Sequence, residues 1–484
     1  MRTQAQHLQA SAKTGALTMA VLMAGTFVFV LDFFVVNVAI PATQADLGAS
    51  DDQIQLVVAT YAIAIASLLI VGGRIGDLFG RRRLFVGGLT LFTAASALCG
   101  AAPSIEVLLA GRIVQGVGAA LFAPQVLSII GVSFEGAARR QAVTVYAVVM
   151  GLGAVSGQLI GGALIELELL GLGWRACYLV NVPIGIAAVA LAPRAIAQSR
   201  EAGGQGLDVP GAALAGATLV AIVLPLIEGR SKGWPAWTFA CLGAALPLGV
   251  AFVLRQRRLA AAGGWPLVDP ALFRHRAFTV GVAASVVFYA GMASFFLVLA
   301  VYLQEGCGLS ALDSGLVFTA LAGGYLAASI GAEALAPRFG RQVLAAGGAI
   351  RAVALSGLVL TVAAVGAGGS PWLLLPALAV DGIGMGLLTA PLVATVVGAM
   401  EERHAGAASG VLSTAQQVGN TIGVAAIGAI FYGALGPDGD FAGAFERALL
   451  CVAAVSLAVA AMVQLLPGPR GAADESGAEA PAAA

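Results

Sequence analysis

The stretch Gly73-Arg74-Ile75-Gly76-Asp77-Leu78-Phe79-Gly80-Arg81-Arg82-Arg83 lies between two long apolar segments. Its glycines allow a tight turn, and its arginines surround a single acid. Arginines at the end of an apolar segment are typical of the cytoplasmic side of a membrane. The stretch therefore predicts a short cytoplasmic turn between two membrane helices, with Asp77 where the first helix ends.

The composition excludes an ordinary soluble protein. Hydrophobic residues make up 59% of the 484 residues and charged residues 10%, and the mean hydropathy is +0.94. Soluble domains carry about 25% charged residues, so a polytopic membrane protein embedded in a lipid bilayer is expected. The net charge is zero, which gives no sign of a nucleic-acid partner. The five cysteines form no CxxC pair and no metal-ligand spacing, so we expect no metal site and no cofactor.

Fourteen segments are apolar over the roughly 20 residues that a spanning helix needs. They lie near 17–40, 54–73, 84–101, 105–129, 141–164, 178–196, 208–228, 236–254, 278–302, 314–335, 342–365, 372–396, 406–432 and 446–466. The first is too long for a signal peptide, so it is kept as a helix. The sequence therefore predicts an all-α polytopic membrane protein with fourteen transmembrane helices.

The basic residues test this count of helices. When loops alternate between the two sides, starting with a cytoplasmic N-terminus, only Arg175, Arg230, Lys232 and Arg447 face the outside. Arg112 and Arg351 fall within helices, and the remaining Lys and Arg are cytoplasmic. This asymmetry is what the positive-inside rule expects. Both termini are therefore predicted to be cytoplasmic.

A weak repeat divides the chain into halves. Pro337-Arg338-Phe339-Gly340-Arg341 resembles the turn at Asp77–Arg81, and parallel halves of this kind occur in secondary transporters. Five regions are predicted: an N-terminal cytoplasmic tail, a six-helix bundle, two extra helices with a cytoplasmic linker, a second six-helix bundle and a disordered cytoplasmic tail. Their boundaries are 1–16, 17–196, 197–277, 278–466 and 467–484.

Further segments match one family in the same order along the chain. They are Leu31–Pro41, Arg112–Ala120, Gly153–Gly162, Trp174-Arg175 with Asn181–Gly185, Tyr302-Leu303-Gln304, and Gly406–Gly410 with Gln416, Gln417, Gly419, Asn420 and Gly423. Together with the turn at Gly73–Arg83, they resemble the major facilitator superfamily, and within it the fourteen-helix drug:proton antiporters of the EmrB/QacA type. The resemblance covers nearly the whole chain.

The resemblance implies two bundles around a central cavity that opens alternately to each side of a bacterial inner membrane. The implied activity is export of a small hydrophobic, amphipathic or cationic compound in exchange for protons, by a protein that works as a monomer and is not an enzyme. No GxxxxGK[ST] motif is present, which disfavours ATP-driven transport.

Asp32 and Arg112 are the first candidates for a site within the membrane. A charge at membrane depth costs roughly 2.5–3.5 kcal/mol on insertion scales, so it normally faces a cavity or a partner. Asp32 is a proton carrier or an anchor for a cationic substrate, or else a hydrated or packing acid. Arg112 is the partner that senses Asp32 or the substrate, or else a donor to helix carbonyls. Asn37, on the same predicted helix as Asp32, is included in this site.

The segment around Gly153, Gly157, Gly161 and Gly162 is small at every fourth residue, which permits close helix packing. It resembles the motif of the exporter branch. The family pattern usually has proline at the position of Gln158, so this chain places an amide where a ligand or Arg112 could meet it.

The turn at Gly73, Arg74, Asp77, Gly80 and Arg81 is interpreted as a conformational gate. Asp77 would latch the two halves through an ion pair and a contact with a helix dipole, and Arg74 and Arg81 would share that latch.

Three more charges lie inside predicted helices of the second half, namely Glu333, Arg351 and Asp381. They form either a second proton site or an internal ion pair, and the sequence assigns no separate roles among them.

Two other functions remain. A facilitator-type transporter of a sugar or amino acid would need several polar cavity residues beyond Asp32 and Arg112. A membrane sensor or enzyme would need an output domain or a catalytic group, yet the three histidines, His7, His275 and His404, lie outside the predicted spans.

Overall fold

The computed structural model describes residues 2–168, 171–199, 206–365, 370–398, 400, 402–436 and 439–466. These residues form helices joined by short turns, with no strand among them. The predicted all-α class is therefore confirmed.

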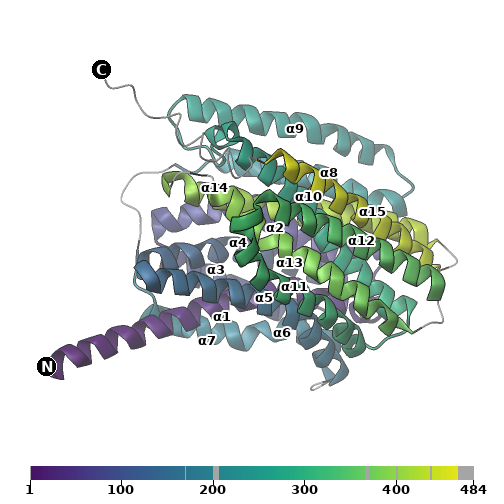
Figure 1. Cartoon of the computed structure of the whole chain (residues 1–484), viewed down its shortest axis with the longest axis horizontal. Helices are drawn as coiled ribbons and strands as arrows, with labels where there is room; N and C mark the ends of the chain where they lie inside the picture. Colours follow the sequence, from purple (N-terminus) through teal and green to yellow (C-terminus); the bar gives the residue numbers. More distant parts are fainter. Residues whose placement is uncertain are drawn as a thin grey trace. The chain divides into compact units, whose positions relative to one another are not determined.

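The chain divides into two compact units. Unit 1 comprises Met1–Leu267 and Gly308–Leu316, and unit 2 comprises Val268–Cys307 and Val317–Ala484. The helices of unit 1 are α1 (Arg2–Leu47), α2 (Asp51–Phe79), α3 (Arg81–Gly100), α4 (Ile105–Ser133), α5 (Gly136–Glu166), α6 (Ala176–Leu179), α7 (Asn181–Ala195), α8 (Val209–Ser231) and α9 (Ala236–Ala261) (Figure 1).

The helices of unit 2 follow a short 3-10 turn, η3 (Pro270–Arg274). They are α10 (Arg276–Val301), α11 (Ala311–Phe339), α12 (Arg341–Val365), α13 (Leu375–Gly398), α14 (Glu402–Leu435) and α15 (Phe441–Met462), and the first turn of α11 is grouped with unit 1.

Thirteen helices in the described part of the chain are long and apolar enough to cross a membrane, and α5, counted as one bent span, makes up to fourteen. Several helices extend beyond the predicted spans, and two of these extensions change the predicted regions. The helix α1 begins at Arg2, so most of the predicted tail 1–16 is helical, and α9 continues past Gln256 to Ala261, which shortens the predicted linker. The predicted disordered tail 467–484 lies outside the described residues.

Close backbone contacts between small residues hold neighbouring helices together in both units. In unit 1, a Cβ on Gly118 of α4 would stand 2.9 Å from the Gly88 carbonyl and 2.6 Å from the Phe92 nitrogen of α3. In unit 2, a Cβ on Gly384 of α13 would stand 2.7 Å from the Gly347 carbonyl and 2.8 Å from the Arg351 nitrogen of α12. Small residues let membrane helices approach in this way, and the same contact in both units supports the predicted repeat.

The extra helices α8 and α9 form a hairpin that belongs to unit 1, where α8 packs against α2 (Figure 1). Asp208, just before α8, accepts hydrogen bonds from Arg255 Nε at 2.6 Å, from Gln256 Nε2 at 2.7 Å and from the Gly211 amide at 2.9 Å. Burial alone would raise the pKa of Asp208, but these donors hold it below its usual value. The carboxylate therefore ties the start of α8 to the end of α9.

Candidate functional site

An ion pair lies at the centre of unit 1. Arg112 Nη1 on α4 donates to Asp32 Oδ2 on α1 at 2.7 Å, and the two side chains are 1% and 0% exposed. The sequence analysis singled out both residues, and the structure brings them into direct contact. Two charges at this depth require a partner, because an unpaired one would carry the full cost of leaving water.

Three neutral side chains complete this ion pair. Gln115 Nε2 donates to Asp32 Oδ1 at 2.7 Å, and its Oε1 accepts from Arg112 Nη1 at 2.7 Å. Asn181 Nδ2 donates to the same Asp32 Oδ1 at 2.9 Å. Ser96 Oγ accepts from Gln115 at 2.6 Å and from Asn181 at 3.4 Å. Both oxygens of Asp32 therefore accept hydrogen bonds in this conformation.

The guanidinium of Arg112 also contacts two residues of α2. Its Nε donates to the Val57 carbonyl of α2 at 3.1 Å, and its Cζ lies 4.1 Å from the centre of the Tyr61 ring, within cation–π range. Residues from α1, α2, α3, α4 and α7 thus meet at one charged centre. We call the set Asp32, Ser96, Arg112, Gln115 and Asn181 the Asp32 network.

The sequence analysis did not assign Gln115, Ser96 or Asn181 to the site. Gln115 follows Arg112 by one helical turn, which places both on the same face of α4. Asn181 is the first residue of α7. Their polarity within apolar segments was the available signal, but it does not reveal which helix each side chain faces.

Two residues assigned to the same site do not join the Asp32 network. Asn37 Nδ2 donates to its own helix, to the carbonyls of Phe33 at 3.3 Å and Phe34 at 3.4 Å. Gln158 is buried, and neither of its amide atoms has a hydrogen-bond partner among the described residues. The contact of Gln158 with Arg112 that the sequence suggested is not formed here.

The glycines of α5 lie against α1, the helix that carries Asp32. Cβ atoms on Gly153, Gly157 and Gly161 would stand 2.9 Å from Val30 Cβ, 2.7 Å from Phe34 Cβ and 2.9 Å from Val35 Cγ2, respectively. Gly162 faces a different segment, the start of α11 at Ala311, which is grouped with the same unit. A larger residue at the first three positions would push α5 away from α1.

The turn between α2 and α3 contacts other parts of unit 1. Asp77 Oδ1 pairs with Arg81 Nη2 at 2.8 Å, one helical turn away. Arg74 donates to the carbonyls of Trp265, at 3.2 Å, and Pro266, in the segment after α9. Gly80 has a φ of 109°, and a Cβ there would collide with the amide of Gln198.

The same turn also holds the end of α7, since Arg82 Nη1 donates to the Ile196 carbonyl at 3.1 Å. The repeated turn of unit 2 makes the equivalent contact, because Arg341 Nη1 donates to the carbonyls of Gln464 at 2.8 Å and Leu466 at 2.5 Å, after α15. Gly73 lies next to Pro124, 3.7 Å from where its Cβ would be. The latch between the two halves remains a prediction.

Unit 2 contains a second buried ion pair. Arg351 Nε of α12 donates to Asp381 Oδ1 of α13 at 3.1 Å, and the two side chains are 1% and 0% exposed. Arg351 Nη2 and Asp381 Oδ2 have no hydrogen-bond partner in the described part of the chain. The side chain of Glu333 lies outside the described residues.

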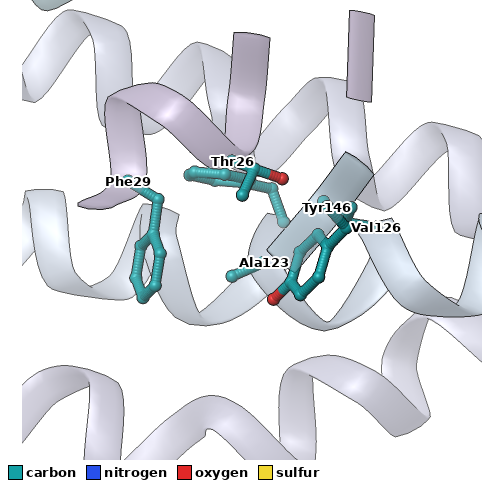
Figure 2. A pocket seen from close by; sticks show the side chains of 6 residues that line it. Thr26, Phe29, Ala123, Val126 and Tyr146 are labelled. Atoms are coloured by element: carbon teal, nitrogen blue, oxygen red, sulfur yellow. The ribbon is translucent and has the colours of Figure 1, made fainter. Parts of the chain in front are cut away.

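A small pocket lies between α1, α4 and α5. Figure 2 shows Thr26, Phe29, Ala123, Val126 and Tyr146 around it. Its volume of about 10 Å³ is close to the minimum for one water molecule. Sites for drug-sized molecules measure about 300–1,000 Å³, so this pocket does not hold a whole substrate in the present conformation.

A groove of about 410 Å³ runs between α1 and α7. Its lining is apolar and consists of Ala20, Val21, Ala24, Pro183, Ile184, Ala187, Ala188 and Leu191. It lacks the few polar groups that orient a ligand. Among the described residues, no cluster of three or more His, Cys, Asp or Glu is placed to bind a metal ion.

The many apolar helices, the internal repeat and a charged centre buried within one half define a membrane transporter. A family model described as Major Facilitator Superfamily matches residues 22–423 and 281–483. The chain belongs to this superfamily, as the sequence motifs predicted.

Several relatives have names that refer to antibiotics. The chain is 36% identical over 419 residues to the "Probable actinorhodin transporter" of Streptomyces coelicolor, covering 86% of this chain and 72% of the relative. It is 36% identical over 478 residues to the "Cephamycin export protein CmcT" of Amycolatopsis lactamdurans, covering 94% of each. It is 34% identical over 422 residues to the "Puromycin resistance protein pur8" of Streptomyces alboniger, covering 86% of this chain and 82% of that protein.

Among solved structures, a crystal structure of a POT family transporter has a TM-score of 0.66, with 13% identity over 92% of this chain and 95% of the other. At this identity the likeness concerns the fold alone. It agrees with the predicted transporter architecture.

Proposed function

We propose that this protein exports small hydrophobic or amphipathic compounds, such as antibiotics, in exchange for protons. The names of the three relatives support export of antibiotics, and their alignments extend over most of this chain. The two repeated units support alternating access, in which one bundle rocks against the other around a site near the middle of the membrane.

The observation that carries the coupling part of the proposal is the buried contact of Asp32 with Arg112, Gln115 and Asn181. A proton on Asp32 would cancel the charge that these donors share and would leave Arg112 without its counter-ion. Breaking a buried ion pair costs about 3–5 kcal/mol. Protonation would therefore favour another arrangement of the five helices that meet here, which is how proton binding can shift a conformational equilibrium.

The remaining expectations follow from the sequence. The distribution of Arg and Lys supports cytoplasmic termini in a bacterial inner membrane. In this orientation the turn at Gly73–Arg83 and the repeated turn at Pro337–Arg341 are both cytoplasmic, where they gate the passage together. The protein works as a monomer, its substrate is hydrophobic or cationic, and it needs the bilayer but no cofactor.

The test uses inverted membrane vesicles with an imposed proton gradient and a pH-sensitive dye. Puromycin, a panel of lipophilic cations and a panel of neutral antibiotics are added one at a time. We expect at least one of them to collapse the gradient with the wild-type protein and to have no effect in vesicles that lack it. A response to sugars or amino acids alone would instead favour a transporter of metabolites.

The matched variants are Asp32→Asn and Asp46→Asn, which make the same change on the same helix. Asp46 lies near the end of α1 and pairs with Arg175 at 2.6 Å, outside the Asp32 network. We expect Asp32→Asn to abolish the response and Asp46→Asn to retain most of it. Full antiport by Asp32→Asn would remove Asp32 from the coupling role.

A further inference from the structure

The ion pair of unit 2 occupies the same level in its repeat as the Asp32 network does in unit 1. The close contact of Gly88 with Gly118 joins α3 to α4, and that of Gly347 with Gly384 joins α12 to α13. Aligned on these contacts, Asp381 stands three residues before Gly384 as Gln115 stands three before Gly118. Asp381 therefore takes the place of the amide at the centre of the Asp32 network.

The same alignment matches Arg351 of α12 with Phe92 of α3. The Arg351 backbone nitrogen lies 2.8 Å from a Cβ built on Gly384, and the nitrogen of Phe92 lies 2.6 Å from a Cβ built on Gly118. Arg351 thus replaces a phenylalanine of unit 1. Each unit therefore carries an arginine and an aspartate at the same level of its own repeat, but at different positions of the aligned helices. Transporters of this architecture bind ligands and coupling ions near the middle of their helices.

The Arg351–Asp381 pair has unused bonding capacity. A buried arginine and carboxylate normally form two parallel hydrogen bonds, yet here a single one joins Nε to Oδ1 at 3.1 Å. Arg351 Nη2 and Asp381 Oδ2 are buried without a partner in the described part of the chain. Buried polar atoms without partners are rare and indicate a missing ligand, water or ion, or a functional role.

Among the described side chains, few charged or titratable groups lie on the helices that pack around Asp381. From α12 comes Arg351, whose guanidinium lies 5.4 Å from the Phe288 ring of α10. From α11 comes Tyr325, whose backbone nitrogen would stand 2.9 Å from a Cβ on Gly382, next to Asp381. The other titratable groups on the described parts of the packed helices are Tyr289 and Arg276 on α10, Asp313 and Arg338 on α11, Arg341 on α12, and Tyr432 on α14.

We propose that Asp381 is a second proton-binding site of the transporter, with Oδ2 as the oxygen that takes the proton and Arg351 as its counter-ion. An O–H bond forms on Oδ2, the proton comes from water on one side of the membrane, and Arg351 keeps its own protons. The carboxylic acid no longer balances the guanidinium, which then favours a conformation in which Arg351 reaches water or an anionic group. This inference adds a site to the proposed proton-coupled export, and its test requires no transport.

The experiment records infrared spectra of the purified full-length protein in lipid nanodiscs while the pH is lowered, with the proton as the only probe. A protonated buried carboxylic acid gives a carbonyl stretch that an ionised carboxylate lacks. We expect the bands that appear in the wild-type protein to include one that is retained in Asp32→Asn and in Asp313→Asn and is absent from Asp381→Asn. Spectra of Asp381→Asn that match the wild type at every pH would overturn the proposal.

A second variant covers the case in which Asp381→Asn does not fold. Arg351→Lys keeps the positive charge but cannot reproduce the bond from Nε to Oδ1. We expect the band to remain and its pH midpoint to move. If neither protein shows a titrating band, Arg351 and Asp381 form a permanent structural ion pair. A band whose midpoint is the same in both proteins would come from an acid other than Asp381. Either result would overturn the proposal.

Discussion

The two units each bury one arginine and one aspartate, but they surround them differently. In unit 1, Asp32 accepts hydrogen bonds from Arg112, Gln115 and Asn181, so both of its oxygens are used. In unit 2, Asp381 accepts one bond from Arg351, and its second oxygen is unused among the described residues.

This difference shows that two buried ion pairs of the same composition can connect different numbers of helices. The Asp32 network joins residues of α1, α3, α4 and α7, and Arg112 also contacts α2, so a change in its charge acts on most of the bundle. The Arg351–Asp381 pair joins two neighbouring helices, and its effect on the rest of unit 2 depends on where Arg351 goes when its partner is neutralised. The predictions below test this contrast.

The largest expected effect comes from removing the arginine of each pair. Arg112→Gln leaves Asp32 Oδ2, the Val57 carbonyl and Gln115 Oε1 without their donor, so we expect a loss of about 3–5 kcal/mol in the free energy of unfolding. Arg351→Gln also breaks a buried ion pair but leaves a single acceptor, Asp381 Oδ1, without its donor, so we expect a smaller loss, at the lower end of the same range. Denaturant unfolding in detergent measures both. An equal or larger loss for Arg351→Gln would contradict the contrast.

The next effect tests the neutral donors of the Asp32 network. Asn181→Leu removes the hydrogen bond to Asp32 Oδ1, and bonds to charged groups contribute about 1.5–3 kcal/mol. The matched control is Asn37→Leu, because Asn37 is also buried but its amide donates to two carbonyls of its own helix. We expect thermal unfolding of Asn181→Leu at a clearly lower temperature than that of Asn37→Leu. The reverse order would mean that Asn181 is dispensable to the site.

A third prediction concerns the packing that positions Asp32. Gly157→Ala places a methyl group 2.7 Å from Phe34 Cβ on α1, and overpacking of this kind costs about 1–3 kcal/mol. Gly87→Ala is the control in the same unit, because a Cβ there meets nothing within 4 Å. The measurement is the unfolding temperature of each variant, which should be lower for Gly157→Ala than for Gly87→Ala. If they are equal, α5 can move away from α1 without cost.

The smallest effect is expected at the α8–α9 hairpin, outside both ion pairs. Asp208→Asn should lower the unfolding temperature by a few degrees, because a carboxylate with three donors is lost, at a cost of about 1–3 kcal/mol. The folded-state pKa of Asp208 is below its usual value, so its contribution is present at neutral pH and is lost as the pH falls through that lowered pKa.

The pH dependence of that difference gives the measurement. The gap in unfolding temperature between the wild type and Asp208→Asn should stay constant near neutral pH and shrink only below about pH 3.9, the ordinary pKa of aspartate. A gap that already closes near neutral pH would contradict the assignment of Asp208 as a hydrogen-bonded carboxylate.

The sequence was sufficient to predict the class of the fold and to single out the two charges that form the ion pair of unit 1, with their pairing left as one of several alternatives. The turn at Gly73–Arg83 and the placement of basic residues depend on local composition, which can be counted directly. Asp32 and Arg112 were found because charges at membrane depth are rare and costly. The superfamily followed from motifs in the correct order.

The partners within the site were harder to predict. Membrane helices such as α1 and α4 are apolar around their whole circumference, so periodicity does not show which face meets which neighbour. Gln115 and Asn181 were therefore passed over. Asn37 was included in the predicted site, although its amide donates to carbonyls of its own helix. Short polar side chains can form such local hydrogen bonds to the backbone instead of reaching another helix. The observed helix ends also differ from the predicted ones. The helix α1, for example, begins at Arg2, in a polar segment that precedes the predicted apolar span.

The central claim is that Asp32 exchanges its proton with substrate binding. The most direct measurement follows proton release from the purified protein in weakly buffered detergent when a compound that collapsed the gradient in vesicles is added. We predict release from the wild-type protein and from Asp46→Asn, and none from Asp32→Asn. Equal release from Asp32→Asn would show that the Asp32 network is structural and that the coupling proton binds elsewhere.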